Sequence, residues 1–211
     1  MNCIKVALTK GRLEKNAINI FEKIGVNCDE LINKGRKLIL KSSNSNIEFI
    51  LIKAVDVLTY VERGVVDIGI VGKDTLMEYN RQLYEVVDLK VGKCKFALAS
   101  IPNFSIKEGF NRKKIATKYP NVAREYFKGK GQDIEIIKME GSVELAPLVG
   151  LADAIIDIVE TGNTLKENGL IVFEDICSIS ARMIVNKNSI KIKKKEITEI
   201  IEKVEGCVEN F

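Results

Sequence analysis

Hydrophobic positions along this chain alternate between strand-like and helix-like spacing. Residues 4–8 and 47–52 are short apolar runs typical of buried strands. Between them, apolar side chains at positions 13, 17, 20, 21 and 24 fall on one helical face, and Gly25 follows as a candidate C-cap. Strands that alternate with helices predict an α/β fold, and we expect largely parallel sheets.

The same alternation continues to the C-terminal end of the chain. Further strands are predicted at residues 37–40, 66–71, 95–101, 115–117, 134–138, 152–159, 171–173 and 182–185. Further helices are predicted after Lys53, at 122–127, at 143–149 with Ser142 as N-cap, before Gly169, and in a last segment with Ile197 and Val204 on one face.

These elements form two series, which predict two α/β lobes. Residues 1–90 are expected to form the first segment of lobe I, and residues 91–170 to form lobe II. Residues 171–211 are expected to return, with the C-terminal helix, to lobe I. Ligands of such proteins commonly bind between lobes.

The composition narrows the function classes. The 211 residues include no histidine, which excludes Ser-His-Asp triads, Cys-His pairs and histidine-ligated metal sites, and we expect no metal site built by the protein. Five scattered cysteines indicate free thiols in a cytoplasmic protein, and the start of the chain does not resemble a signal peptide. No apolar run approaches the roughly 20 residues of a membrane span.

The net charge of +4 derives partly from a basic run at residues 187–195. This run contains no interleaved aromatic residue, so it favours a solvated loop and helix start over a nucleic-acid surface.

The most informative segment is the apolar run 152–159 with the turn that follows it. Glu160, Thr161, Gly162, Asn163 and Thr164 lead into a predicted helix, where backbone amides and the helix dipole favour an anion. Gly162 permits close approach of the backbone, so the turn could hold one phosphate monoester. An ordinary turn capped by a threonine would have the same local sequence.

Two carboxylates favour the phosphate interpretation. Asp153 and Asp157 are four residues apart, which places both on one face of a strand, with Asp157 nearer the turn. Carboxylates repel a bare phosphate, but they suit a ligand that also carries hydroxyls or a metal ion, such as a ribose phosphate with Mg²⁺.

Four segments together resemble the ATP phosphoribosyltransferase family. Residues 140–170 (EGSVELAPLVGLADAIIDIVETGNTLKENGL) are similar to its signature. Residues 8–13 (LTKGRL), 67–74 (DIGIVGKD) and 116–121 (ATKYPN) resemble three further motifs, in family order. The resemblance implies two lobes similar to type II periplasmic binding proteins, with the active site in the cleft between them.

The resemblance also implies the reaction. Adenine N1 of ATP attacks the anomeric carbon of 5-phosphoribosyl 1-pyrophosphate, giving phosphoribosyl-ATP and pyrophosphate, with substrate-bound Mg²⁺, at the first step of histidine biosynthesis. Adenine N1 carries a free lone pair near neutral pH, so a chain without histidine can support this chemistry through alignment and charge stabilisation.

The family motifs imply roles for individual residues. The turn 160–164, Asp153 and Asp157 would bind phosphoribosyl pyrophosphate, with Asp157 also catalytic. Lys10 and Arg36 would act on the reacting phosphates. The expected ATP and phosphate contacts are Lys10, Gly11, Arg12, Arg36, Lys53 and Lys73.

Three positions depart from the family pattern. Thr9 and Leu58 stand where the family usually has proline, and Lys53 stands where it usually has arginine. Lysine is a point charge without the bidentate fork of arginine, so ATP could be held differently at Lys53.

The chain stops at Phe211, which resembles the short-form catalytic subunit. Short-form members act with a regulatory subunit that resembles histidyl-tRNA synthetase, so a hetero-oligomer is expected. Two rivals stay open: a ligand-binding module of the same fold without chemistry, and a phosphoribosyltransferase that uses another base.

Overall fold

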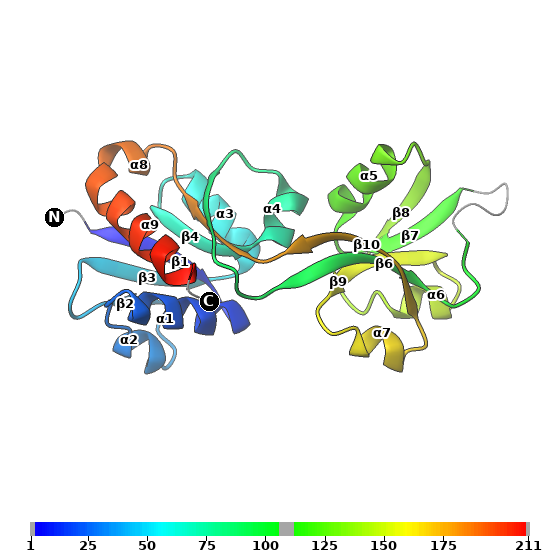
Figure 1. The fold of residues 1–211 in the computed structure, drawn as a ribbon, viewed down its shortest axis with the longest axis horizontal. Helices are drawn as coiled ribbons and strands as arrows, with labels where there is room; N and C mark the ends of the chain where they lie inside the picture. The colour runs from blue at the N-terminus through cyan, green and yellow to red at the C-terminus, as the bar shows by residue number, and fades with distance from the viewer. Residues whose placement is uncertain (1–2, 106–111, 210–211) are drawn as a thin grey trace. The chain divides into compact units, whose positions relative to one another are not determined.

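The computed structural model describes residues 3–105 and 112–209. Met1, Asn2 and Phe211, at the outer limits of the lobes expected from the sequence, lie outside the described residues. The chain divides into two compact units (Figure 1). Unit 1 comprises Met1–Leu76, Asn80–Gly92 and Ser180–Phe211, and unit 2 comprises Met77–Tyr79 and Lys93–Ile179.

Unit 1 is built around a mixed six-stranded sheet in the order β2-β3-β1-β4-β11-β5. Strands β3, β1 and β4 are parallel neighbours, whereas β2, β11 and β5 run antiparallel to theirs. The strands are β1 (Ile4–Thr9), β2 (Ile39–Lys41), β3 (Ile47–Ile52), β4 (Ile68–Gly72), β5 (Tyr84–Asp88) and β11 (Ala181–Val185).

Helices cover both faces of this sheet because strand side chains alternate between the faces. On one face, α1 (Arg12–Lys23) and α9 (Lys194–Val208) share a core with Val6 and Ile70 (Figure 1). On the other face, α3 (Ala54–Glu62) packs against Ala7 and Val71. Shorter helices complete the connections: α2 (Asp29–Ile32), α4 (Lys73–Tyr79, which ends in unit 2) and α8 (Ser189–Ile192).

Unit 2 has a mixed five-stranded sheet in the order β10-β6-β9-β7-β8. Strands β9, β7 and β8 are parallel, β6 runs antiparallel to its neighbour β9, and β10 runs antiparallel to its neighbour β6. One face packs on α5 (Pro120–Gly129), the other on α6 (Leu145–Leu148) and α7 (Asn163–Glu167). The strands are β6 (Cys94–Ser100), β7 (Lys113–Thr117), β8 (Ile134–Lys138), β9 (Ala154–Val159) and β10 (Ile171–Ile179).

The α/β fold and most of the elements expected from the periodicity are confirmed, and three expectations are wrong. The sheets are mixed and not largely parallel, because β11 runs antiparallel to β4 in unit 1, and β6 runs antiparallel to β9 and β10 in unit 2. Ser142 has a left-handed backbone (φ 48°), so it does not cap a helix, and α6 is only Leu145–Leu148. The expected strand 171–173 extends through Ile179 and pairs with β6, so this segment stays in unit 2 and the return to unit 1 begins at Ser180.

Candidate functional site

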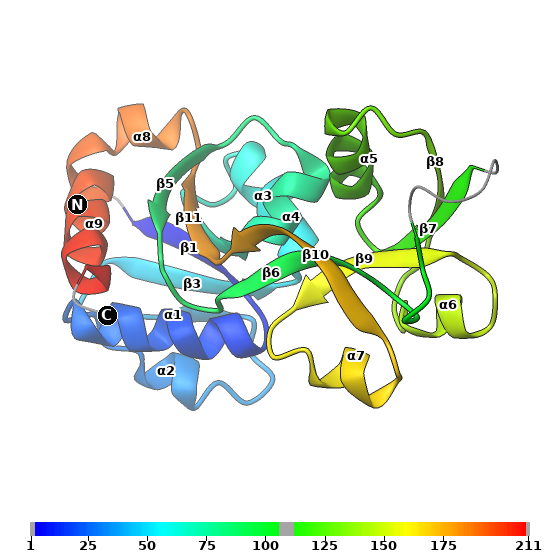
Figure 2. The same cartoon turned by 45° about the vertical axis from the view of Figure 1, so that its right-hand side comes forward.

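In unit 2, the segment that the sequence assigned to a phosphate is a turn between β9 and α7 (Figure 2). Gly162 caps α7 with a left-handed backbone (φ 79°), a conformation that glycine adopts without steric cost. Across residues 3–105 and 112–209, no acceptor is found for the amides of Thr161, Gly162 and Thr164. The turn therefore presents amide donors at a helix start, and its residues are mostly exposed.

Asp157 lies on β9, shortly before the turn begins. Burial raises the pKa of its carboxyl to about 6, the nearby Glu144 raises it further, and the Ile158 amide and Lys118 oppose the shift. The side chain is only partly exposed, and its burial disfavours the ionised carboxylate relative to the protonated carboxyl. A carboxyl group with a raised pKa beside an exposed turn is a candidate for contact with a polar ligand.

Asp153 does not join Asp157 at the turn, although the odd positions 155 and 159 do share one face of β9. Asp153 precedes the strand, and its Oδ2 accepts the Lys114 amide at 2.6 Å. Six residues lie between Asp153 and Glu160, and the seven steps of roughly 3.3 Å give a span of about 23 Å, so Asp157 is the carboxylate nearer the turn, as expected. The carboxylate of Asp153 links β7 to the start of β9, and its contact with phosphoribosyl pyrophosphate stays a prediction.

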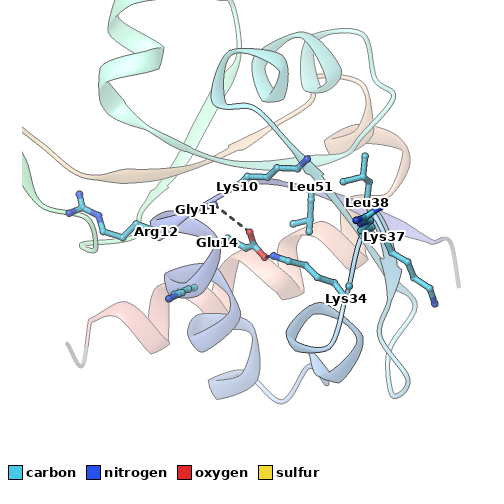
Figure 3. A pocket seen from close by; sticks show the side chains of 11 residues that line it. Lys10, Gly11, Arg12, Glu14, Lys34, Lys37, Leu38 and Leu51 are labelled. Atoms are coloured by element: carbon cyan, nitrogen blue, oxygen red, sulfur yellow. Dashed lines mark hydrogen bonds and ion pairs between the residues drawn. The ribbon is translucent and has the colours of Figure 1, made fainter. Parts of the chain in front are cut away.

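In unit 1, four of the residues expected to bind phosphates line one pocket of about 780 Å³ (Figure 3). Lys10, Gly11 and Arg12 connect β1 to α1, and Arg36 comes from the turn before β2. Leu38 and the buried Leu51 add an apolar wall. Lys15, Lys34 and Lys37 also line the pocket, so its lining is strongly cationic.

Glu14 is the acidic residue in this cationic lining. It is 5% exposed, and its Oε2 accepts the Gly11 amide at 3.4 Å. Its Oε1 forms an ion pair with Lys34. Glu14 thus connects the start of α1 to the turn that carries Arg36.

Lys53 and Lys73 lie at the carboxyl ends of β3 and β4, the edge at which α/β sheets place their ligands. Lys53 is exposed at the start of α3, and Lys10 is beside it, since the Lys10 amide donates to the Ile52 carbonyl at 3.0 Å. Lys73 is engaged otherwise: its Nζ lies 2.6 Å from Glu85 Oε2. The Thr9 hydroxyl, at a position where the sequence departs from the family, donates to the Ile70 carbonyl and joins β1 to β4.

Glu14, Lys34, Lys118 and Glu144 were not among the residues predicted from the sequence. Each is a common type of charged residue. Lys118 lies in the ATKYPN segment and Glu144 in the signature segment 140–170, so the resemblance could have singled out both. Glu14 and Lys34 gain their place only through tertiary contacts.

Within the described ranges, no group of three or more His, Cys, Asp or Glu side chains is arranged to hold a metal ion. In the same ranges, no helix is both long and apolar enough to span a bilayer.

The two α/β units define a class by their fold: a two-lobed α/β protein similar to type II periplasmic binding proteins. The periplasmic aliphatic sulphonate binding protein SsuA of Escherichia coli has the same fold, with a TM-score of 0.63 at 14% identity, covering 97% of this chain and 72% of that one. This likeness concerns the fold alone.

Sequence comparison then identifies the family. Residues 53–206 match the family described as HisG: ATP phosphoribosyltransferase. An ATP phosphoribosyltransferase of Clostridium acetobutylicum is 68% identical over 206 residues, which are 98% of this chain and 96% of that protein. The structure titled ATP phosphoribosyl transferase (HisG:HisZ) complex from Thermotoga maritima superposes with a TM-score of 0.81 at 35% identity, covering 99% of this chain and 100% of that chain.

The chain therefore belongs to the ATP phosphoribosyltransferase family. It is a pentosyltransferase that acts at the first step of histidine biosynthesis.

Proposed function

We propose that the β9–α7 turn of unit 2 binds the 5′-phosphate of phosphoribosyl pyrophosphate, and that the unit 1 pocket binds phosphates of ATP and of the leaving pyrophosphate. The observation that carries this proposal is the turn itself, where amides without an acceptor among the described residues and the left-handed Gly162 lie at the start of α7. Thr161, Asn163 and Thr164 are the proposed side-chain contacts of the phosphate, together with Glu160 on the sugar side.

Asp157 is the proposed catalytic carboxylate. Its place beside the turn suits a contact with the ribose hydroxyls or with their metal ion. Adenine N1 needs no base, so the remaining work is alignment and stabilisation of the pyrophosphate charge. Lys10 and Arg36, on two sides of one pocket, are proposed to supply that stabilisation, and Gly11, Arg12 and Lys53 to contact the same phosphates.

Mg²⁺ is proposed to arrive on the diphosphate of the substrate. Mg²⁺ binds proteins through one or two carboxylates while retaining waters and phosphate ligands. The pair of carboxylates available near the turn, Asp157 and Glu144, fits that small donor set. The ion would supply charge neutralisation of the leaving pyrophosphate.

We further propose a regulatory partner and a cytoplasmic location. The Thermotoga maritima complex pairs its phosphoribosyltransferase with HisZ, and we expect this chain to form a hetero-oligomer with a similar subunit, one that resembles histidyl-tRNA synthetase. The described cysteines form no disulfide with one another, which suits a reducing compartment. Lys73, paired with Glu85, would reach a phosphate only by exchanging that partner.

The test is to incubate the chain and its partner with ATP, phosphoribosyl pyrophosphate and Mg²⁺, and to follow the near-ultraviolet absorbance of phosphoribosyl-ATP. Product is expected. Binding without product would favour a ligand-binding module, and product only with another base would favour a different phosphoribosyltransferase. An isolated chain that equals the complex in activity and in inhibition by histidine would refute the partner.

A further inference from the structure

The turn that carries Arg36 is held at both of its ends. The Lys37 amide donates to the Lys34 carbonyl at 3.0 Å, which closes a four-residue turn with Gly35 and Arg36 at its centre. Gly35 has φ 56°, so the turn uses a conformation that glycine permits. After the turn, the Leu51 amide donates to the Leu38 carbonyl at 2.9 Å and fixes the chain on β3. We call residues 34–37 the Arg36 turn.

The other end of the Arg36 turn is fixed by an ion pair. Lys34, whose side chain is 32% exposed, meets Glu14, whose side chain is 7% exposed, on the first turn of α1 (Figure 3). The same carboxylate accepts the Gly11 amide. Through Glu14, the Arg36 turn and the Lys10–Arg12 segment are joined to one another across 20 residues of sequence.

The pairing also decides the charge that the pocket presents. An anionic ligand among these cations would be repelled by an unpaired carboxylate, and a carboxylate buried without a partner is unfavourable. Lys34 neutralises Glu14 and is itself committed to it. Of the cations in the lining, Lys34 is therefore the least suited to contact a phosphate directly.

We propose that Glu14 and Lys34 are positioning residues, which act on the leaving pyrophosphate through Arg36 by holding its turn against the Lys10–Arg12 segment. This inference rests on the proposed function, because it assumes that Arg36 meets the reacting phosphates. A misplacement of about 1 Å in a catalytic group can lower a rate on the order of a hundredfold. Loss of the ion pair therefore affects turnover more than substrate affinity.

The experiment measures kcat and both KM values of the chain in complex with its partner. Lys34→Met is expected to lower kcat about tenfold or more while each KM changes less than about threefold. Lys41→Met is the matched control, since it removes the same charge from β2, close to the Arg36 turn in sequence, and Lys41 is not part of the pocket lining. Its expected effect on kcat is below about threefold. Lys34→Arg, which can pair with Glu14 again, is expected to restore most of the lost kcat.

A double-mutant cycle decides whether Lys34 acts through Arg36. Adding Lys34→Met to Arg36→Met is expected to lower kcat by less than about twofold further, because the group to be positioned is already gone. Glu14→Gln keeps an acceptor for the Gly11 amide and weakens the ion pair, so it should lower kcat in the same direction if Lys34→Met fails to fold.

The outcomes separate this inference from the proposed function. A wild-type complex that forms no phosphoribosyl-ATP would overturn both. Product formation with equal effects of Lys34→Met and Lys41→Met would overturn the positioning role alone, since the loss of positive charge in unit 1 would explain both. Effects of Lys34→Met and Arg36→Met that multiply, or an Arg36→Met variant with full activity, would also overturn it.

Discussion

Asp157 is expected to cost the folded chain stability at neutral pH, and its replacement by asparagine should recover that stability while lowering turnover. Burial is the main cause that raises the pKa of Asp157 from 3.8 to about 6. The interval spans about two pH units, and each unit corresponds to about 1.36 kcal/mol, so about 3 kcal/mol is an upper limit. Because the side chain is partly exposed, we expect about 1–2 kcal/mol.

The sign follows from the raised pKa. The protonated carboxyl favours the folded state, and this contribution is fully present below pH 3.8 and is lost as the pH rises through about 6. The asparagine side chain that replaces Asp157 would stay neutral throughout. The Asp157→Asn variant should therefore gain stability over the wild type between about pH 4 and pH 6, and keep the gain above that window.

The assay is thermal unfolding of both proteins at pH 4, 6 and 8. For a chain of this size, about 1–2 kcal/mol raises Tm by roughly 2–8 °C at pH 8, with little difference at pH 4. Asp153→Asn is the matched control: it removes the same charge near the same strand, but its carboxylate accepts the Lys114 amide and should not stabilise on removal. Equal Tm values for Asp157→Asn and wild type at every pH would refute the reasoning about burial, and an unchanged kcat would remove Asp157 from the catalytic residues.

Three further predictions concern single side chains. Gly162→Val should abolish binding of phosphoribosyl pyrophosphate, measured by calorimetry, while the fold persists, because a β-branched side chain at φ 79° distorts the turn. Gly131→Val, at φ 64° with no neighbour near its added Cβ, controls for backbone strain. An affinity of Gly162→Val within about threefold of wild type (about 0.7 kcal/mol) would disprove the assignment. Glu78→Ala should lower the free energy of unfolding in urea by about 1–2 kcal/mol, because Oε2 accepts two amides at the start of α5; unchanged stability would contradict this. Lys53→Arg should lower KM for ATP, since arginine offers a fork to phosphate, and a higher KM would count against a contact there.

Local pattern was sufficient for the elements whose apolar side chains repeat with one period. Strand β3 and the apolar face of α9 were expected where they occur, because their buried positions follow the strand and helix periods. Strand β10 was expected to be short because only its first three residues form an apolar run. Its remaining residues, EDICSI, mix polar and apolar positions without a strand period, and their strand state derives from pairing with β6.

The candidate site was predictable where it depended on one turn, and less so where it depended on contacts distant in sequence. Gly162 occupies the left-handed position that its place before a helix suggested. The expected contact of Asp153 with the substrate stays a prediction, because a period of two fixes the face of a strand but not the ligand that its residues bind. The pairing of Glu14 with Lys34 spans 20 positions, and no local pattern encodes it.

The order of the strands has a consequence for synthesis on the ribosome. Strand β11 lies inside the unit 1 sheet, between β4 and β5, although it is the last strand of the described chain. All residues of unit 2 precede Ser180, so that unit can complete its core while unit 1 still has an open gap between β4 and β5. The nascent unit 1 therefore exposes the unpaired edges of β4 and β5 until the last part of the chain is translated. During this interval, unit 1 is most prone to aggregation and most dependent on chaperones.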